Sequence, residues 1–127
     1  MKSLQQIYTI KAPIIKVWEA LVDPKIIDQW GGGPAKMHQK EGDTFSLWGG
    51  DVHGTNIKVK PPTFLEQDWY GGEWGAPSKV TFTLTAQSVT STKIVLIQDG
   101  IPDSDFEDIR DGWKQYYLGP LKELLEK

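Results

Sequence analysis

The alternation of apolar and polar residues along the chain predicts an antiparallel β-sheet with one covered face. In the clearest stretch, Val80, Phe82 and Leu84 alternate with threonines, as expected for a strand with one buried side and one side facing water. Glycine, proline and aspartate recur between such stretches at hairpin intervals and mark turns. The segments that we predict as strands are residues 4–11, 35–40, 44–48, 52–60, 64–70, 79–87 and 93–98.

A different spacing of apolar residues, in steps of three and four, predicts helices. Val17, Trp18 and Leu21 share one face of a short helix that Pro24 ends. A second short helix starts at Pro24 and stops at the glycines that follow Trp30, since proline suits a first helical turn and glycine often ends a helix. The chain therefore leaves the first strand for two short helices before the sheet continues.

A long amphipathic helix is predicted over the last quarter of the chain. Gly119 and Pro120 interrupt it, and we expect a distortion near Tyr116 because proline removes a helical hydrogen bond and crowds the carbonyl four residues earlier. This helix covers the inner face of the sheet, which gives an α+β fold in a single domain, residues 1–127. Its apolar positions are Phe106, Ile109, Trp113, Tyr116, Tyr117, Leu121, Leu124 and Leu125.

Composition narrows the classes of partner and compartment. The 127 residues carry 14 basic and 17 acidic side chains, for a formal net charge of -3, which gives no electrostatic reason to bind nucleic acid or an anionic membrane. The chain shows no apolar run of the length, about 18 residues, that a membrane span needs, and no signal peptide. It also lacks cysteine, which fits a reducing compartment. We therefore expect a cytoplasmic protein.

Six tryptophans, four tyrosines and four phenylalanines are a heavy aromatic content for this length. Any one of these rings is most simply part of the core. Together they favour a cavity, because large flat rings fill the space between a curved sheet and a helix less completely than branched aliphatic side chains do. We predict that an apolar or aromatic small molecule binds there, against Trp30, Phe45, Trp48, His53, Trp69, Trp74, Phe82, Gln98, Trp113 and Tyr117. Among these, Gln98, His53 or Tyr117 would orient the ligand by hydrogen bonds.

Residues suited to catalysis are few. Without cysteine, and without a serine in a nucleophile motif, covalent catalysis is not expected. Neither His38 nor His53 has an acidic residue at metal-ligand spacing, so we predict no metal and no cofactor. General acid-base catalysis stays open, because a carboxyl group of Glu66, Asp68 or Glu73 placed in an apolar pocket would have a raised pKa.

The motifs of the chain also follow one another in a characteristic order. They are Ala12-Pro13, Val17 to Leu21, Asp23-Pro24 with Trp30, Gly42 to Phe45, Gly54, Leu65 to Trp69, Val80 to Leu84, Asp99 to Pro102, Gly112-Trp113, Tyr116 to Leu118 and Pro120-Leu121. Over nearly the whole chain this order resembles the activator of Hsp90 ATPase homologue 1-like family, within the START/Bet v 1-like (SRPBCC) superfamily. The resemblance implies the helix-grip fold, a curved antiparallel sheet of about six or seven strands around a long C-terminal helix. Gln98 departs from the pattern, since relatives often carry histidine there.

Three functions are consistent with these features. The favoured hypothesis is a small-molecule binding domain with an apolar cavity. The resemblance implies an alternative, a co-chaperone-like domain that binds a protein partner such as an Hsp90 chaperone, because the family includes such domains beside ligand binders and enzymes. A small enzyme of the cyclase or isomerase type would use the same cavity with an inward acid or base. An interior without a cavity would favour the protein partner.

Overall fold

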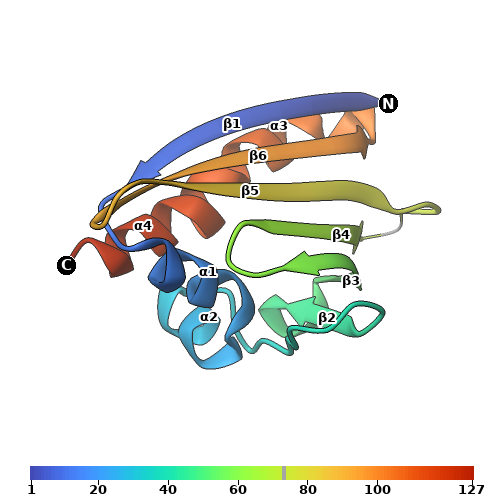
Figure 1. The fold of residues 1–127 in the computed structure, drawn as a ribbon. Coiled ribbons are helices and arrows are strands. Elements are labelled where there is room, and N and C mark those ends of the chain that lie inside the picture. Colours follow the sequence, from blue (N-terminus) through green and yellow to red (C-terminus); the bar gives the residue numbers. More distant parts are fainter. Residues whose placement is uncertain (73) are drawn as a thin grey trace.

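The computed structural model describes residues 1–72 and 74–127, and its main element is a six-stranded antiparallel sheet (Figure 1). The strands are β1 (Lys2–Ile10), β2 (Thr44–Leu47), β3 (Val52–Lys60), β4 (Phe64–Gly71), β5 (Ser78–Ser88) and β6 (Ser91–Ile101). Their order across the sheet is β1-β6-β5-β4-β3-β2. Strand β1 thus forms one edge of the sheet and pairs with β6, while β2 to β6 form a meander. This confirms the predicted antiparallel topology.

One predicted strand, at residues 35–40, is wrong. In this segment Lys36 forms a single antiparallel bridge with Ser46 and the chain then turns away. Met37 is buried, and the backbone carbonyl of His38 accepts a hydrogen bond from the Asn56 side chain at 2.7 Å. The segment is therefore held by one backbone bridge and by side-chain contacts instead of a continuous ladder, which strand propensity alone cannot reveal.

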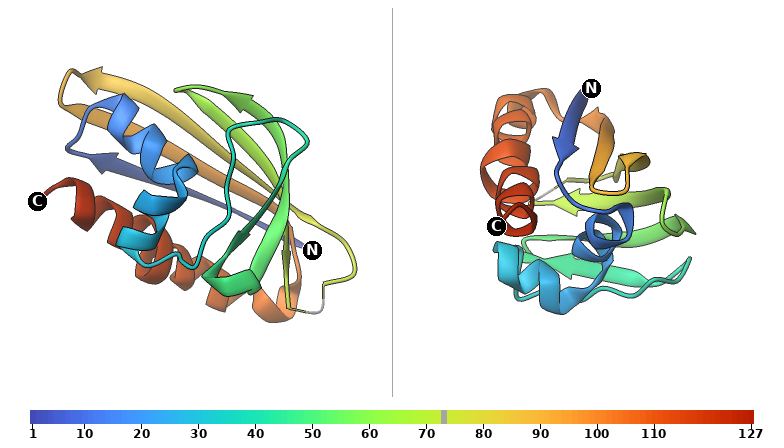
Figure 2. Two further views of the ribbon diagram at one scale, coloured as in Figure 1. Left: turned by 90° about the horizontal axis from the view of Figure 1, so that it is seen from below. Right: turned by 60° about the vertical axis from the view of Figure 1, so that its left-hand side comes forward.

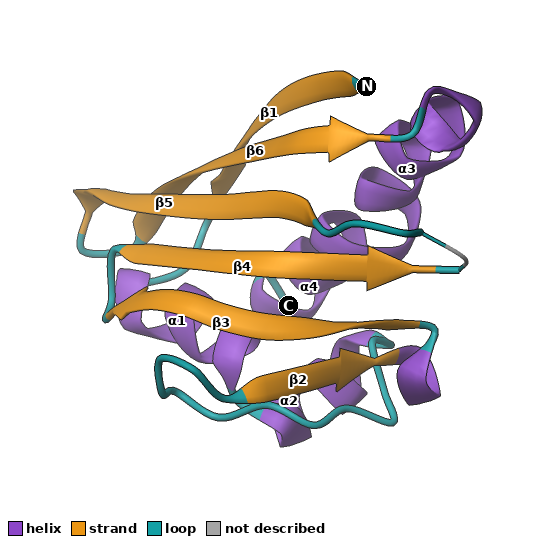
Figure 3. Cartoon of the chain, turned by 90° about the vertical axis from the view of Figure 1, so that its right-hand side faces the viewer, coloured by secondary structure: helices purple, strands orange, loops and turns teal. Residues whose placement is uncertain are grey.

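The helices lie on one side of the sheet (Figure 3), with α1 (Ile14–Val22) and α2 (Pro24–Trp30) next to the C-terminal helix (Figure 2). The side chain of Asp23 accepts a hydrogen bond from the backbone N–H of Lys25 at 2.9 Å and so caps α2, as an aspartate before a helix should. Gly31 ends α2 with a φ of 104°, a left-handed conformation that suits glycine. Both predicted short helices are confirmed.

The long C-terminal helix is built from a short 3₁₀ turn (Asp103–Asp105), α3 (Phe106–Gly112), a π-helical turn (Trp113–Tyr117) and α4 (Leu118–Leu125). The π turn ends at Tyr117, two residues before Gly119, and it includes Tyr116, where the distortion is predicted from Pro120. A Cβ atom added at Gly119 would overlap the carbonyl oxygen of Lys114. Glycine is therefore required for the helix to pass through this turn.

The core lies between the inner face of the sheet and these helices. Val80, Phe82 and Leu84 are all buried, which confirms the alternation in β5. Phe82 pairs in register with Leu65 of β4 and Leu96 of β6, so the inward residues of three strands form one apolar layer. None of the helices in residues 1–72 and 74–127 is long and apolar enough to cross a membrane.

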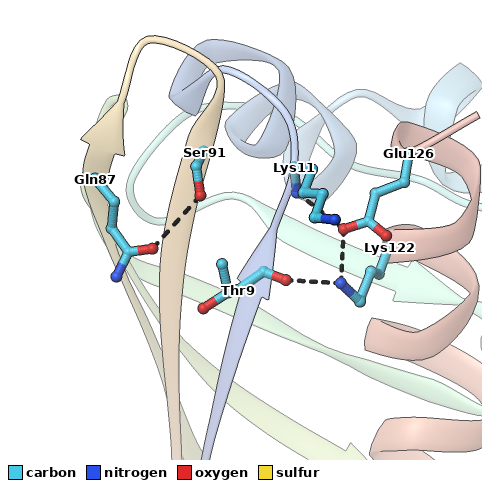
Figure 4. A network of polar contacts seen from close by, with 6 residues as sticks. All are labelled: Thr9, Lys11, Gln87, Ser91, Lys122 and Glu126. Atoms are coloured by element: carbon cyan, nitrogen blue, oxygen red, sulfur yellow. Dashed lines mark hydrogen bonds and ion pairs between the residues drawn. The ribbon is translucent and has the colours of Figure 1, made fainter.

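Polar contacts fasten the end of the C-terminal helix to the end of β1 (Figure 4). The Lys122 ammonium group donates to the backbone carbonyl of Thr9 at 2.8 Å and pairs with Glu126 at 2.6 Å. Glu126 also accepts from the backbone N–H of Lys11 at 2.9 Å. The hydrogen bonds from Lys122 and Lys11 hold the pKa of Glu126 below its ordinary value. The C-terminal end of the helix is thereby attached to the end of β1.

Candidate functional site

Five of the aromatic residues singled out from the sequence lie around a sixth, Tyr117. This side chain is 1% exposed and projects from the π turn toward the sheet. Because the rings come from α2, the 3₁₀ turn at Trp48–Gly50, β4, β5 and the π turn, they join every layer of the fold. The distances from the Tyr117 ring centroid are 4.5 Å to Trp30, 4.9 Å to Trp113, 5.7 Å to Phe82, 6.0 Å to Trp69 and 6.2 Å to Trp48. We call these six residues the aromatic cluster.

Centroid distances of this size are those of rings in tilted and edge-on contact. Trp69 also lies 4.9 Å from Trp113 and 6.2 Å from Phe45, centroid to centroid. The middle of the space in which the sequence predicts a cavity is therefore filled by the side chains that were expected to surround it. The sequence identified the residues that come together, but these pack against one another.

The polar tips of the cluster are already bonded within the protein. The indole N–H of Trp113 donates to Oε1 of Gln98 at 2.8 Å, and Nε2 of Gln98 donates to Ser78 at 3.0 Å. The indole N–H of Trp69 donates to Gln67 at 2.8 Å, and Gln67 in turn donates to Asn56 at 2.8 Å. Buried polar groups need such partners. The prediction that Gln98 orients a ligand is not supported, because both ends of its amide are engaged.

Tyr117 differs from Gln98 in this respect. Its hydroxyl group is buried and has no hydrogen-bond partner among the described residues. Burial raises the pKa of the Tyr117 hydroxyl well above its ordinary value, because the phenolate form would lose its hydration. Of the three side chains predicted to orient a ligand, Tyr117 alone combines burial with a free polar atom.

His53 does not join the cluster. Its side chain is exposed and stacks on Tyr70 at 5.6 Å between centroids, with the ring planes 9° apart. Tyr70 follows Trp69 in β4, and successive strand residues point to opposite faces, so His53 and Tyr70 lie on the outer face. The prediction of an inward His53 is wrong, because the buried positions of β3 are Gly54 and Asn56.

The acid-base candidates lie away from the cluster for the same reason. Glu66 and Asp68 alternate in β4 with the buried Leu65, Gln67 and Trp69, which directs both carboxyl groups to the outer face. Glu73 lies outside the described residues. Neither Glu66 nor Asp68 therefore supplies the inward acid or base that a cyclase or isomerase would use.

Trp74 is also separate from the aromatic cluster. Its backbone N–H donates to the Gly71 carbonyl at 3.2 Å, and its indole N–H donates to the carboxylate of Asp105 at 2.8 Å. The half-buried ring thus bridges the loop after β4 to the start of the C-terminal helix. It forms part of the wall of an open hollow there.

Two adjoining hollows run along the C-terminal helix on the side of β3 and β4. The first is an apolar pocket of about 190 Å³, and the second is a larger open hollow of about 750 Å³. They share Val52, Trp69 and Ile109, so we treat them as one surface, the helix groove. Its lining includes Trp48, Asp51, Val52, Trp69, Trp74, Asp105, Asp108, Ile109, Gly112, Trp113, Tyr116 and Tyr117.

Sequence reasoning missed the acidic part of this groove. Asp105, Asp108, Ile109 and Gly112 follow one another in steps of three, one and three, which places them on one helix face. Carboxylates in the first turns of a helix are favoured there by the positive end of the helix dipole, so their presence alone does not indicate a groove. The spacing could have identified the stripe, but not the sheet edge that it faces.

The chain is similar to proteins that act with Hsp90. It is 35% identical over 88 residues to the activator of 90 kDa heat shock protein ATPase homolog of Dictyostelium discoideum, covering 68% of this chain and 23% of that protein. It is 27% identical over 124 residues to the Hsp90 co-chaperone AHA1 of Saccharomyces cerevisiae, covering 90% of this chain and 35% of that one. The chain therefore spans about a third or less of the length of these curated relatives.

Solved structures share the whole fold. The crystal structure of an HSP90 activator from Plasmodium falciparum superposes with a TM-score of 0.91 at 22% identity and covers 98% of this chain and 96% of that chain. The predicted helix-grip fold is thus confirmed. The family model described as "Activator of Hsp90 ATPase homolog 1-like protein" matches residues 11–126. The chain belongs to this family, as the order of its motifs predicts.

Proposed function

We propose that the chain is a cytoplasmic co-chaperone domain that binds an Hsp90-type chaperone. The observation that carries the proposal is the aromatic cluster, in which the rings expected to surround a ligand contact one another and Trp69 and Trp113 bond to glutamines of the protein. Because these side chains already contact and bond to one another inside the protein, a function at the protein surface is favoured. Membership of the family, and its Hsp90-activating relatives, supply the class of partner.

The outer face of β1 and β6 offers a surface for such a partner. Ile7 is 59% exposed and Ile97 is 37% exposed. Ile7 is paired with Val95, and Gln5 with Ile97, so Ile7 and Ile97 are diagonal neighbours across two strands. Because the side chains of Ile7 and Ile97 do not point into the core, a partner can bury them without disturbing the packing of the fold.

Direct binding of the purified chain to an Hsp90-type ATPase tests the proposal. We expect saturable binding that Ile7→Glu weakens by roughly tenfold, the loss that corresponds to about 1.4 kcal/mol. Val89→Glu is the matched control, because Val89 is 87% exposed in the turn between β5 and β6 and the same charge is introduced. No binding by the unmodified chain would overturn the proposal, and equal losses in both variants would remove the assignment of the surface.

A second function, small-molecule binding, is favoured by the apolar pocket of the helix groove. The pocket of about 190 Å³ is lined by apolar and aromatic side chains, and the one unbonded buried hydroxyl among the described residues belongs to Tyr117 in its wall. Trp48, another wall residue, has a left-handed φ of 49°, a conformation that costs energy in a non-glycine residue. The ligand would then bind in an open groove instead of an enclosed cavity.

The six tryptophans provide reporters for this second function. We expect phenylbutanol to shift the indole N–H signals of Trp48 and Trp113 in two-dimensional NMR spectra. The signal of Trp18, whose N–H donates to Gln39 at 2.8 Å in another part of the core, should stay in place. Equal shifts of all indole N–H signals would contradict small-molecule binding in the groove. The absence of any shift at the solubility limit of phenylbutanol would also contradict it.

A further inference from the structure

The helix groove joins an apolar end to an acidic end. Asp51, Asp105 and Asp108 line the larger hollow, and Val52, Trp69 and Ile109 continue from it into the apolar pocket. Asp105 and Asp108 lie on the same helix face as Ile109. A ligand lying along the helix would therefore contact carboxylates first and apolar side chains next.

The carboxylates of the groove carry charge without a basic neighbour. Asp51, Asp105 and Asp108 are absent from the ion pairs that the described residues form, which join Met1 to Asp103, Arg110 to Asp111 and Lys122 to Glu126. Lysine, arginine and histidine are likewise absent from the described lining of both hollows. Three negative charges on one partly apolar surface favour a positively charged ligand.

Aromatic rings reinforce the preference for a cation. Trp74 is fixed by its hydrogen bond to Asp105 at 2.8 Å, so that an indole and a carboxylate stand side by side in the wall of the hollow. The face of an indole attracts ammonium groups, more strongly where water is partly excluded. In the adjoining pocket, Tyr117 forms part of the wall, and its buried hydroxyl group has no partner in the described part of the chain.

The size of the apolar pocket limits the ligand. Its volume of about 190 Å³ is similar to that of an engineered cavity of about 150 Å³ that accepts benzene. We propose that the helix groove binds an organic ammonium ion whose single-ring apolar body enters the pocket beside Tyr117 and whose nitrogen lies among Asp51, Asp105 and Asp108. This inference rests on the second of the two proposed functions and adds the charge of the ligand.

Calorimetry with three probes of equal shape tests the charge. Phenylbutylamine is a cation at neutral pH, phenylbutanol is neutral and phenylbutyrate is an anion. We expect the amine to bind roughly tenfold more tightly than the alcohol, the anion to bind most weakly, and added salt to reduce the difference. Equal affinity of the amine and the alcohol would overturn the inference while small-molecule binding stands. If neither the amine nor the alcohol binds, both the inference and the proposed small-molecule binding are wrong.

Variants locate the site. The double change Asp51→Asn and Asp108→Asn should abolish the preference for the amine over the alcohol, because the two carboxylates that attract the ammonium group become neutral amides. Glu107→Gln is the control, because Glu107 is an exposed residue of the same helix that does not line either hollow. Gly112→Leu, which places a side chain in the pocket, should prevent binding of both probes. Retention of the amine preference in the double variant would contradict the assignment.

Discussion

At the scale of single residues, the buried hydroxyl group of Tyr117 costs stability. It has no hydrogen-bond partner among the described residues, and a buried polar group left unbonded costs about 1–3 kcal/mol. We predict that Tyr117→Phe raises the free energy of unfolding by about 1 kcal/mol, measured by chemical denaturation at neutral pH. A loss of stability instead would show that the hydroxyl group is bonded in solution.

The same hydroxyl group should make the protein sensitive to alkali. Its pKa is raised in the folded state from the ordinary value of 10.0 by burial. As the pH rises, the unfolded chain therefore releases this proton before the folded chain does. The Tyr117 hydroxyl group leaves the free energy of unfolding unchanged below pH 10.0 and lowers it as the pH rises above that value. We predict that Tyr117→Phe unfolds at a higher pH than the unmodified chain. Tyr116→Phe, at a position that is 63% exposed, serves as control and should keep the original profile.

Two glycines of the C-terminal helix should respond to alanine in opposite directions. A Cβ at Gly112 would make only an ordinary contact of 3.7 Å with Tyr116, so Gly112→Ala should gain about 0.5–1 kcal/mol of helix stability. At Gly119 the Cβ would overlap the Lys114 carbonyl oxygen, and Gly119→Ala should cost about 1–3 kcal/mol. Thermal unfolding of both variants checks the pair. Equal effects would contradict the geometry of the π turn.

At the scale of elements, the π turn fixes the long helix to the sheet through Trp113. This ring is 3% exposed, lies 5.7 Å from Phe82 of β5 between centroids and bonds to Gln98 of β6. We predict that Trp113→Ala lowers the free energy of unfolding by about 3–5 kcal/mol, as expected for a tryptophan in a filled core. A loss below about 1 kcal/mol would indicate that the ring borders a void instead, because little packing would then be lost.

The elements themselves could largely be predicted from the sequence, because their signals are local. Alternation in β5, the cap at Asp23 and the proline after the π turn each act over a few residues. The segment at residues 35–40 was wrongly predicted as a strand, since it forms only one bridge, to Ser46, and another of its bonds goes to the side chain of Asn56, which is distant in sequence. The orientation of His53 likewise depends on which residues of β3 face inward, and Gly54 gives no hydrophobic signal for this.

At the scale of the whole molecule, the sequence indicated which rings gather but not how closely. Whether Trp30, Trp69 and Tyr117 enclose a space or fill it depends on the register of several strands and on the π turn, which no local pattern encodes. The hydrogen bond from Trp113 to Gln98 likewise cannot be predicted locally, because it forms only when the C-terminal helix packs on β6. The acidic stripe of the helix groove has a local spacing in the sequence, but its position beside Trp69 and Trp74 depends on how the helix lies on the sheet.

The rate of ATP hydrolysis by a purified Hsp90-type chaperone, titrated with this chain, tests the proposed function most directly. A domain that acts through its surface while its aromatic cluster serves as core should raise the rate to a plateau, and Ile7→Glu should require a higher concentration for the same effect. Gly112→Leu, which fills the apolar pocket of the helix groove, should leave the plateau unchanged. A rate that the unmodified chain does not alter, together with saturable binding of phenylbutanol, would contradict the co-chaperone function and favour small-molecule binding.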